Sequence, residues 1–175
     1  MENDTPITAE GVEMAADAAK TVKEIILSRL PTGSTIEDVN IRVYSSKLLR
    51  CVQTAFQIAQ ELKRPIYTSS GLALTAVAVA KRRHKFQFLK MPELRSYCVG
   101  TELFCCDNTE DPDNTLPVDK DHWLDAVHSV VQRDEINVIV AHRETIRNIT
   151  ERRYRLPYCC IGVFAYDFEA AAHHT

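Results

Sequence analysis

Strand-like and helical hydrophobic patterns alternate along this chain of 175 residues. In residues 12–30 the apolar side chains recur every three or four positions, as in an amphipathic helix, and Thr8 precedes them as a good N-cap. Residues 39–44 are β-branched and alternate like a strand, and residues 48–62 return to helical spacing. Such alternation predicts right-handed βαβ units. The expected fold is therefore α/β, with a mostly parallel sheet between two layers of helices.

The pattern continues in the second half of the chain. It predicts a short strand at 65–68, a helix at 121–131, an apolar strand at 136–141, a helix at 145–154 and a closing strand at 159–166. Residues 71–117 have no clear period and contain many turn residues. We interpret them as an insertion or lid within a single domain that covers residues 1–175.

Charge and composition exclude several classes of protein. A formal net charge of −3 gives no overall attraction to nucleic acid or to an anionic membrane. The longest apolar stretch, residues 72–80, is much shorter than the roughly 20 residues that cross a bilayer. Because the first residues also lack the pattern of a secretory signal, we expect no membrane segment and a location in the cytoplasm or the nucleus.

The six cysteines are expected to be reduced thiols. Four of them form two pairs of neighbours in the sequence, and the chain shows no export signal. Their spacing does not match a zinc site, so no metal and no cofactor is expected. The cysteines are Cys51, Cys98, Cys105, Cys106, Cys159 and Cys160.

Two clusters of polar residues follow predicted strands. Ligands of open parallel sheets bind beyond the carboxyl ends of the strands. The residues at these ends are 45–50 and 142–144, which include Arg50 and His142. Each residue also has a purely structural interpretation, with Arg50 paired to a helix carboxylate and His142 a hydrogen-bonded core histidine.

Four segments in order resemble the histidine phosphatase superfamily, which has the phosphoglycerate-mutase-like fold. The family's S-S-P-x-x-R-x-x-Q-T-A segment is similar to VYSSKLLRCVQTAFQIAQEL (residues 43–62), and its second histidine strand is similar to VIVAHRETIRNIT (138–150). The opening helix resembles DTPITAEGVEMAADAAKTV. The closing strand LPYCCIGVFAYD resembles that of the branch with the suppressor-of-T-cell-receptor-signalling and ecdysteroid-phosphate phosphatases.

The resemblance implies roles for individual residues. A phosphatase of this kind needs a nucleophilic imidazole, cations for the phosphoryl oxygens and a general acid for the leaving group. Arg50 would be a phosphate clamp and His142 the histidine that hydrogen-bonds the phosphoryl group without attacking it. Ser46 is grouped with them as a phosphate-binding residue, and Glu93 is a candidate acid.

Several positions depart from the family pattern. The family's opening strand ends in Arg-His-Gly, where the histidine is the nucleophile, but the seven residues before Thr8 contain neither His nor Arg. No carboxylate follows Gly71-Leu72, where the branch has its acid, and Lys47 replaces a usual proline. Arg143 and Glu144 stand where small residues are usual, and we expect them to crowd the pocket or to form an ion pair. The expectation is a catalytically inactive binding or assembly module with a residual anion pocket.

Two alternatives remain open. In the first, the protein is an active phosphatase that uses His84 or a cysteine as nucleophile, or that has an N-terminal segment which this sequence lacks. In the second, basic clusters bind a phosphopeptide or nucleic acid. These clusters comprise Lys81, Arg82, Arg83 and Lys85, together with Arg152, Arg153 and Arg155.

The resemblance also raises a question about sheet closure. In the family the opening strand lies between the strand that ends at His142 and the closing strand. Without it, a central strand would have an unpaired edge, which is costly. We therefore expect residues 136–141 to pair directly with 159–166, or a strand to come from the N-terminal residues or from another chain. A protein partner or a homodimer is expected on this ground.

Overall fold

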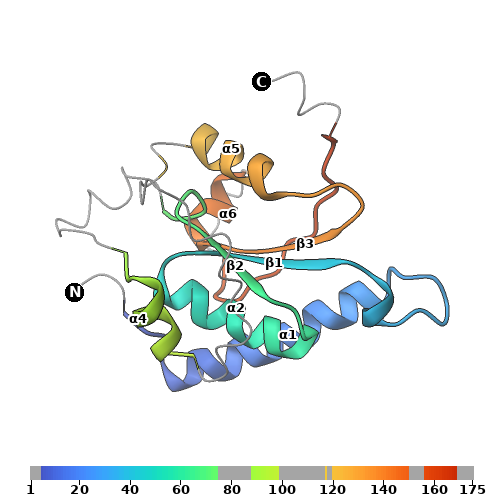
Figure 1. The fold of residues 1–175 in the computed structure, drawn as a ribbon, viewed down its shortest axis with the longest axis horizontal. Coiled ribbons are helices and arrows are strands. Elements are labelled where there is room, and N and C mark those ends of the chain that lie inside the picture. Colours follow the sequence, from blue (N-terminus) through green and yellow to red (C-terminus); the bar gives the residue numbers. More distant parts are fainter. Residues whose placement is uncertain (1–4, 75–87, 99–116, 118–119, 150–155, 169–175) are drawn as a thin grey trace.

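The computed structural model describes residues 5–74, 88–98, 117, 120–149 and 156–168. Three parallel strands form a sheet in the order β2-β1-β3 (Figure 1). The strands are β1 (Ile41–Ser46), β2 (Ile66–Ser69) and β3 (Ile136–Val140). In register, Val43 of β1 lies opposite Ile66 of β2 and Val138 of β3. The prediction of a parallel α/β sheet is confirmed.

Helices α1 (Ala9–Leu27) and α2 (Leu49–Leu62) cover one face of the sheet (Figure 1). The Thr8 side chain accepts a hydrogen bond from the Gly11 N–H at 3.1 Å, so the predicted N-cap of α1 is confirmed. Both helices turn an apolar stripe to the sheet and form the larger core with it. Its fully enclosed side chains include Ala55, Val52, Val43 and Ile66.

Helices α5 (Lys120–Val130) and α6 (Arg143–Ile149) lie on the other face (Figure 1). Trp123 and Val127 of α5 pack with Tyr44 of β1 and with Leu72, which follows β2. The molecule therefore has the expected three layers. A short helix, α4 (Met91–Ser96), falls within the region that was interpreted as an insertion.

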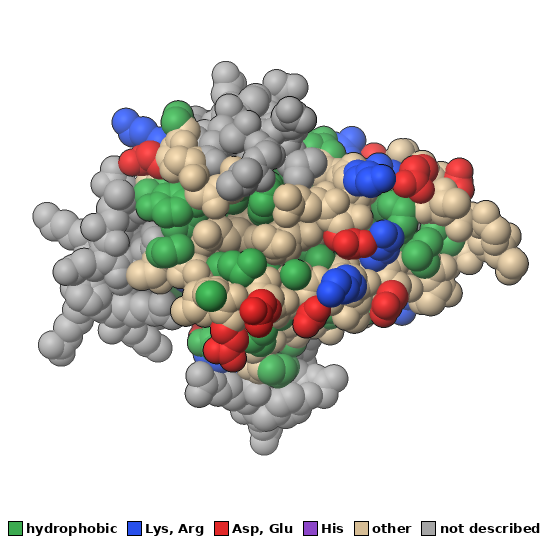
Figure 2. All heavy atoms as spheres, turned by 90° about the horizontal axis from the view of Figure 1, so that it is seen from below, with side chains coloured by type: hydrophobic (Ala, Val, Ile, Leu, Met, Phe, Trp, Pro, Cys, Tyr) green, Lys and Arg blue, Asp and Glu red, His purple; other side chains and the backbone are tan. Residues whose placement is uncertain are grey.

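The outer surface of α1 carries charged side chains together with the exposed Val12 and Leu27. Figure 2 looks at the molecule from this side and shows acidic and basic side chains interspersed along the helix. Lys20 and Asp17 form an exposed ion pair at 3.0 Å, of a kind that adds little stability. None of the helices in the described part of the chain is both long and apolar enough to span a bilayer.

The predicted closing strand at 159–166 is wrong. Residues 160–167 run without strand hydrogen bonding, and Cys159 before them has a left-handed backbone with φ 52°. The predicted direct pairing with 136–141 is also wrong, because among the described residues β3 pairs only with β1. A β-prone sequence becomes a strand only where a neighbouring strand accepts it, and in the described part of the chain no strand pairs with this segment.

Candidate functional site

The site lies where the carboxyl ends of β1 and β3 meet. Because Ser45 is paired with Val140, the next residues on both strands emerge at the same edge of the sheet. The Ser46 Oγ lies 3.1 Å from the His142 Nε2. Both side chains are buried, with Ser46 0% and His142 4% exposed. The histidine that the sequence singled out is thus fixed within the protein.

Arg50 reaches the same imidazole from the first turn of α2. Its guanidinium Nη2 lies 3.4 Å from the His142 Nδ1, and the side chain is half-buried. The turn between β1 and α2 sets this position: the Leu48 N–H donates to Ser46 Oγ at 3.3 Å, and the Leu48 carbonyl accepts from Cys51 and Val52. The structure therefore brings Arg50, His142 and Ser46 together.

Sequence reasoning did not predict a contact between Cys51 and the ring. The Cys51 Sγ lies 3.6 Å from Nε2 and 3.8 Å from Nδ1 of His142, and the residue is 6% exposed. Both distances are within hydrogen-bonding range for sulfur, so the thiol is a further polar contact of the ring. The one sequence feature that could have indicated this contact is that Cys51 directly follows Arg50.

Arg143 and Glu144 form the expected ion pair. The Arg143 Nη2 lies 3.2 Å from the Glu144 Oε1, and the guanidinium also sits over the Tyr158 ring at 4.8 Å from its centre. Arg143 is thus held by its neighbours in sequence and by an exposed aromatic ring.

The remaining sequence candidates lie elsewhere or outside the described residues. The exposed Glu93 accepts a hydrogen bond from the Lys90 N–H at 2.8 Å at the start of α4. His84 and the two basic clusters fall within 75–87 and 150–155, outside the described part of the chain. In the described part, Cys51, Cys98, Cys159 and Cys160 form no disulfide, and no group of side chains there is suited to a metal ion.

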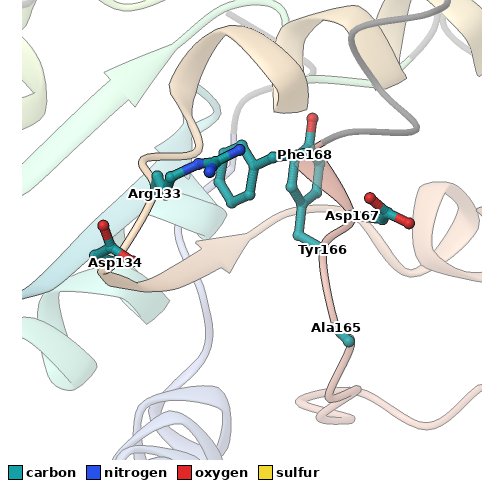
Figure 3. A pocket seen from close by; sticks show the side chains of 6 residues that line it. All are labelled: Arg133, Asp134, Ala165, Tyr166, Asp167 and Phe168. Carbon is teal, nitrogen blue, oxygen red and sulfur yellow. The ribbon is translucent and has the colours of Figure 1, made fainter.

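A separate pocket lies between the end of α5 and the C-terminal segment. Figure 3 shows the Arg133 side chain beside the Phe168 ring, with Tyr166 next to it. The guanidinium carbon lies 5.3 Å from the centre of the Phe168 ring. The Phe168 and Tyr166 rings meet edge-on, with their centres 4.5 Å apart. The Tyr166 hydroxyl also bonds to His128 Nδ1. This pocket shares no residue with the site around His142.

The first part of the chain matches a known family. Residues 1–73, which include Ser46 and Arg50, match the model described as "Histidine phosphatase superfamily (branch 1)". This similarity to the histidine phosphatase superfamily extends over 73 of the 175 residues. The superfamily that was predicted from the sequence is therefore confirmed. No curated protein sequence matches the chain.

The chain has a fold similar to that of a solved phosphatase. It is similar to the ecdysone phosphate phosphatase of Bombyx mori, solved in complex with tungstate, with a TM-score of 0.54 and 18% identity. The alignment covers 94% of this chain but 62% of that protein. Mycobacterial hydrolase 1 is also similar, with a TM-score of 0.48 and 19% identity over 90% of this chain and 71% of that one.

Proposed function

We propose that this chain is a histidine-phosphatase-like binding module, in which Arg50 and His142 hold the phosphate group of a phosphorylated ligand without hydrolysing it. One observation supports this proposal most directly. A guanidinium and an imidazole that are 92 residues apart in sequence meet at 3.4 Å, at the carboxyl edge of a parallel sheet. This is the edge where such sheets bind ligands.

The residues at this edge suit an oxyanion. A guanidinium can donate two parallel hydrogen bonds to phosphate oxygens. The N-terminus of α2, where Arg50 lies, carries the positive end of the helix dipole, which favours an anion nearby. Lys47 is largely buried next to Ser46 and adds positive charge at the end of β1.

The geometry of His142 supports binding without turnover. A nucleophilic imidazole must direct a free lone pair at phosphorus. The two ring nitrogens of His142 instead face Ser46 and Arg50, and the ring is 4% exposed.

Titration calorimetry with inorganic phosphate tests the binding. A charge-assisted hydrogen bond contributes about 1.5–3 kcal/mol, so Arg50→Ala is expected to weaken binding by roughly 10- to 100-fold. Arg29→Ala removes the same charge from an exposed position after α1 and is the matched control. Equal affinity of the Arg50→Ala and Arg29→Ala proteins would contradict the proposed site.

An assay with p-nitrophenyl phosphate between pH 5 and 8 tests the absence of turnover. We expect no hydrolysis above that of the buffer. Hydrolysis that is lost in His142→Ala would show that the imidazole is catalytic, and hydrolysis that is lost in Cys51→Ser would identify the thiol as nucleophile. Either result would replace the binding module with an enzyme.

A further inference from the structure

Cys159 and Cys160 are neighbouring cysteines that the anion site does not use. Both side chains are partly exposed, whereas Cys51 and Cys98 are buried. Within the described part of the chain, neither member of the pair forms a disulfide or a hydrogen bond. Of the four cysteines described, these two are therefore the ones that a reagent in solution can reach and engage together.

The backbone at Cys159 departs from a strand, in which neighbouring thiols would point apart. Successive side chains of a strand point to opposite faces. Cys159 instead has a left-handed backbone with φ 52°, inside a turn that also contains Tyr158. Burial raises the pKa of the Cys159 thiol, and the Cys160 thiolate raises that pKa further. Each sulfur thus lies within the electrostatic range of the other.

The turn that carries the pair has a contact with α6. The guanidinium carbon of Arg143, the first residue of α6, lies 4.8 Å from the centre of the Tyr158 ring. Arg143 is itself paired with Glu144 at 3.2 Å. A ligand that bridges the two sulfurs therefore binds to a turn that already has a shape, which lowers the conformational entropy lost on binding.

A direct disulfide between these neighbours would be strained. The Cα atoms on either side of a trans peptide are about 3.8 Å apart, whereas the Cα atoms of a disulfide are usually about 4.4–6.8 Å apart. Such strain makes a disulfide easy to reduce. One additional atom between the sulfurs enlarges the ring and relieves the strain. The pair is thus better suited to an atom that bonds to both sulfurs than to a bond between them.

The number of ligands indicates which kind of atom fits. Zinc in proteins usually takes three or four side-chain ligands. Among the described residues, no group of three or more cysteine, histidine or carboxylate side chains is placed to hold a metal ion. Trivalent arsenic takes two thiolates and fills its third position with a substituent of its own. Its pyramidal geometry also keeps the two sulfurs close together, so it matches an adjacent pair.

We propose that Cys159 and Cys160 form a dithiol site that captures a trivalent arsenical. With an arsine oxide, both S–H bonds break and two As–S bonds form. The two protons leave with the oxygen as water, and arsenic stays trivalent, so no oxidant or reductant is needed. The product has no thiolate charge, which suits a partly buried pair. The site shares no residue with the anion site, and the inference does not depend on the proposed function.

Phenylarsine oxide is the probe, and native mass spectrometry of the dilute, reduced protein measures its binding. Dilution keeps the chains apart, so the reagent meets the single chain. We expect a phenylarsenic adduct that survives an excess of glutathione but is removed by 2,3-dimercaptopropanol. A monothiol competes poorly with two thiols held at high effective concentration, whereas a small dithiol chelates arsenic in the same way.

The variants assign the adduct to a pair of cysteines. Cys105 and Cys106 are also neighbours but lie outside the described residues, so the reference protein is the double variant Cys105→Ser/Cys106→Ser. It should keep the glutathione-resistant adduct. Cys159→Ser or Cys160→Ser, each added to this reference, should abolish the adduct. Cys98→Ala is the matched control, because it also removes one thiol but leaves the pair intact.

An adduct that is lost in Cys159→Ser and in Cys160→Ser but kept in Cys98→Ala would support the site. If the reference protein holds no glutathione-resistant arsenical, the proposal is wrong. An adduct that persists in Cys159→Ser or in Cys160→Ser would also overturn it, because another thiol would then take part in the capture.

Discussion

The Cys98 thiol follows α4 and is almost completely enclosed, with 3% of the residue exposed. Burial raises the pKa of this thiol to about 11, because an apolar environment disfavours the charged thiolate. Only the thiolate is nucleophilic. We therefore expect iodoacetamide to leave Cys98 unmodified in the folded protein at pH 8, as measured by peptide mass spectrometry.

The unfolded protein is the control for this prediction. In urea the Cys98 thiol should return to an ordinary pKa of about 8.5 and react within the same time. The folded protein keeps the Cys98 proton to a higher pH than the unfolded protein does. The contribution of the protonated, buried thiol to the free energy of unfolding is therefore complete below about pH 8.5 and is lost as the pH rises towards about 11. Rapid modification of Cys98 at pH 8 without denaturant would show that the side chain is accessible.

The convergence of Arg50 and His142 could be predicted from the sequence, whereas their contacts could not. Both residues follow strand patterns, and parallel strands bring their carboxyl ends to one edge. The bond from Ser46 to His142 and the contact of Cys51 with the ring depend on side-chain rotamers. Hydrophobic spacing does not determine rotamers, so the positioning of the imidazole required the structure.

At the scale of elements, α2 ends on a residue with a strained backbone. Lys63 has a left-handed conformation with φ 52°, which costs a residue with a Cβ about 1–2 kcal/mol. Its position lets the Arg64 N–H bond to the Ala59 carbonyl at 3.0 Å. Lys63→Gly should stabilise the protein by about 0.5–1 kcal/mol in urea unfolding, since the more flexible unfolded glycine offsets part of the gain.

The matched variant for this prediction is Lys63→Ala. It removes the same side chain but keeps the Cβ, so the backbone strain should remain. A gain in stability from Lys63→Ala equal to that from Lys63→Gly would show that the lysine side chain, and not the left-handed backbone, is unfavourable.

Gly71 marks a close approach between the segment after β2 and α5. A Cβ at this position would lie 2.6 Å from the Cβ of Ala126, which is closer than real contacts allow. Gly71→Ala should therefore push α5 away from the sheet and cost about 1–3 kcal/mol of unfolding free energy. Thermal or urea unfolding measures the loss.

A double-mutant cycle tests whether Ala126 is the cause. Ala126→Gly alone should cost about 1 kcal/mol through lower helix propensity, but it also removes the methyl group that Gly71→Ala would meet. The double variant should thus be more stable than the sum of the two single effects predicts. Strict additivity would mean that the strain at Gly71 arises elsewhere.

Helices and strands whose apolar side chains form one continuous buried stripe were predicted well from the sequence. The helix predicted at 48–62 is α2, and the strand predicted at 136–141 is β3, each within one residue at either end. The strand predicted at 159–166 failed because a ladder needs a second strand, and pairing over long distances is not encoded in local periodicity.

At the scale of the whole molecule, the segment after α6 leaves apolar surface uncovered. Residues 156–166 contain no charged side chain. Four large hydrophobic residues of this segment are 39–65% exposed: Tyr158, Ile161, Val163 and Phe164. Among the described residues, β3 also has a strand partner on one side only. An unpaired edge and a run of exposed apolar residues are features of interaction surfaces.

We expect copies of this chain to associate through residues 158–164. Sedimentation velocity should show a coefficient that rises with protein concentration. Phe164→Lys should reduce this association, because a lysine placed in an apolar interface must lose its hydration without gaining a partner. Tyr97→Lys is the control, since Tyr97 is also an exposed aromatic residue, at 48%, but lies after α4.

The control decides which surface drives association. If Tyr97→Lys and Phe164→Lys lower the sedimentation coefficient equally, the association does not depend on the 158–164 segment in particular. If the unmodified protein sediments as a monomer at every concentration, copies do not cover this surface. A different polypeptide would then be the remaining candidate to pair with it, as strand addition at an open sheet edge allows.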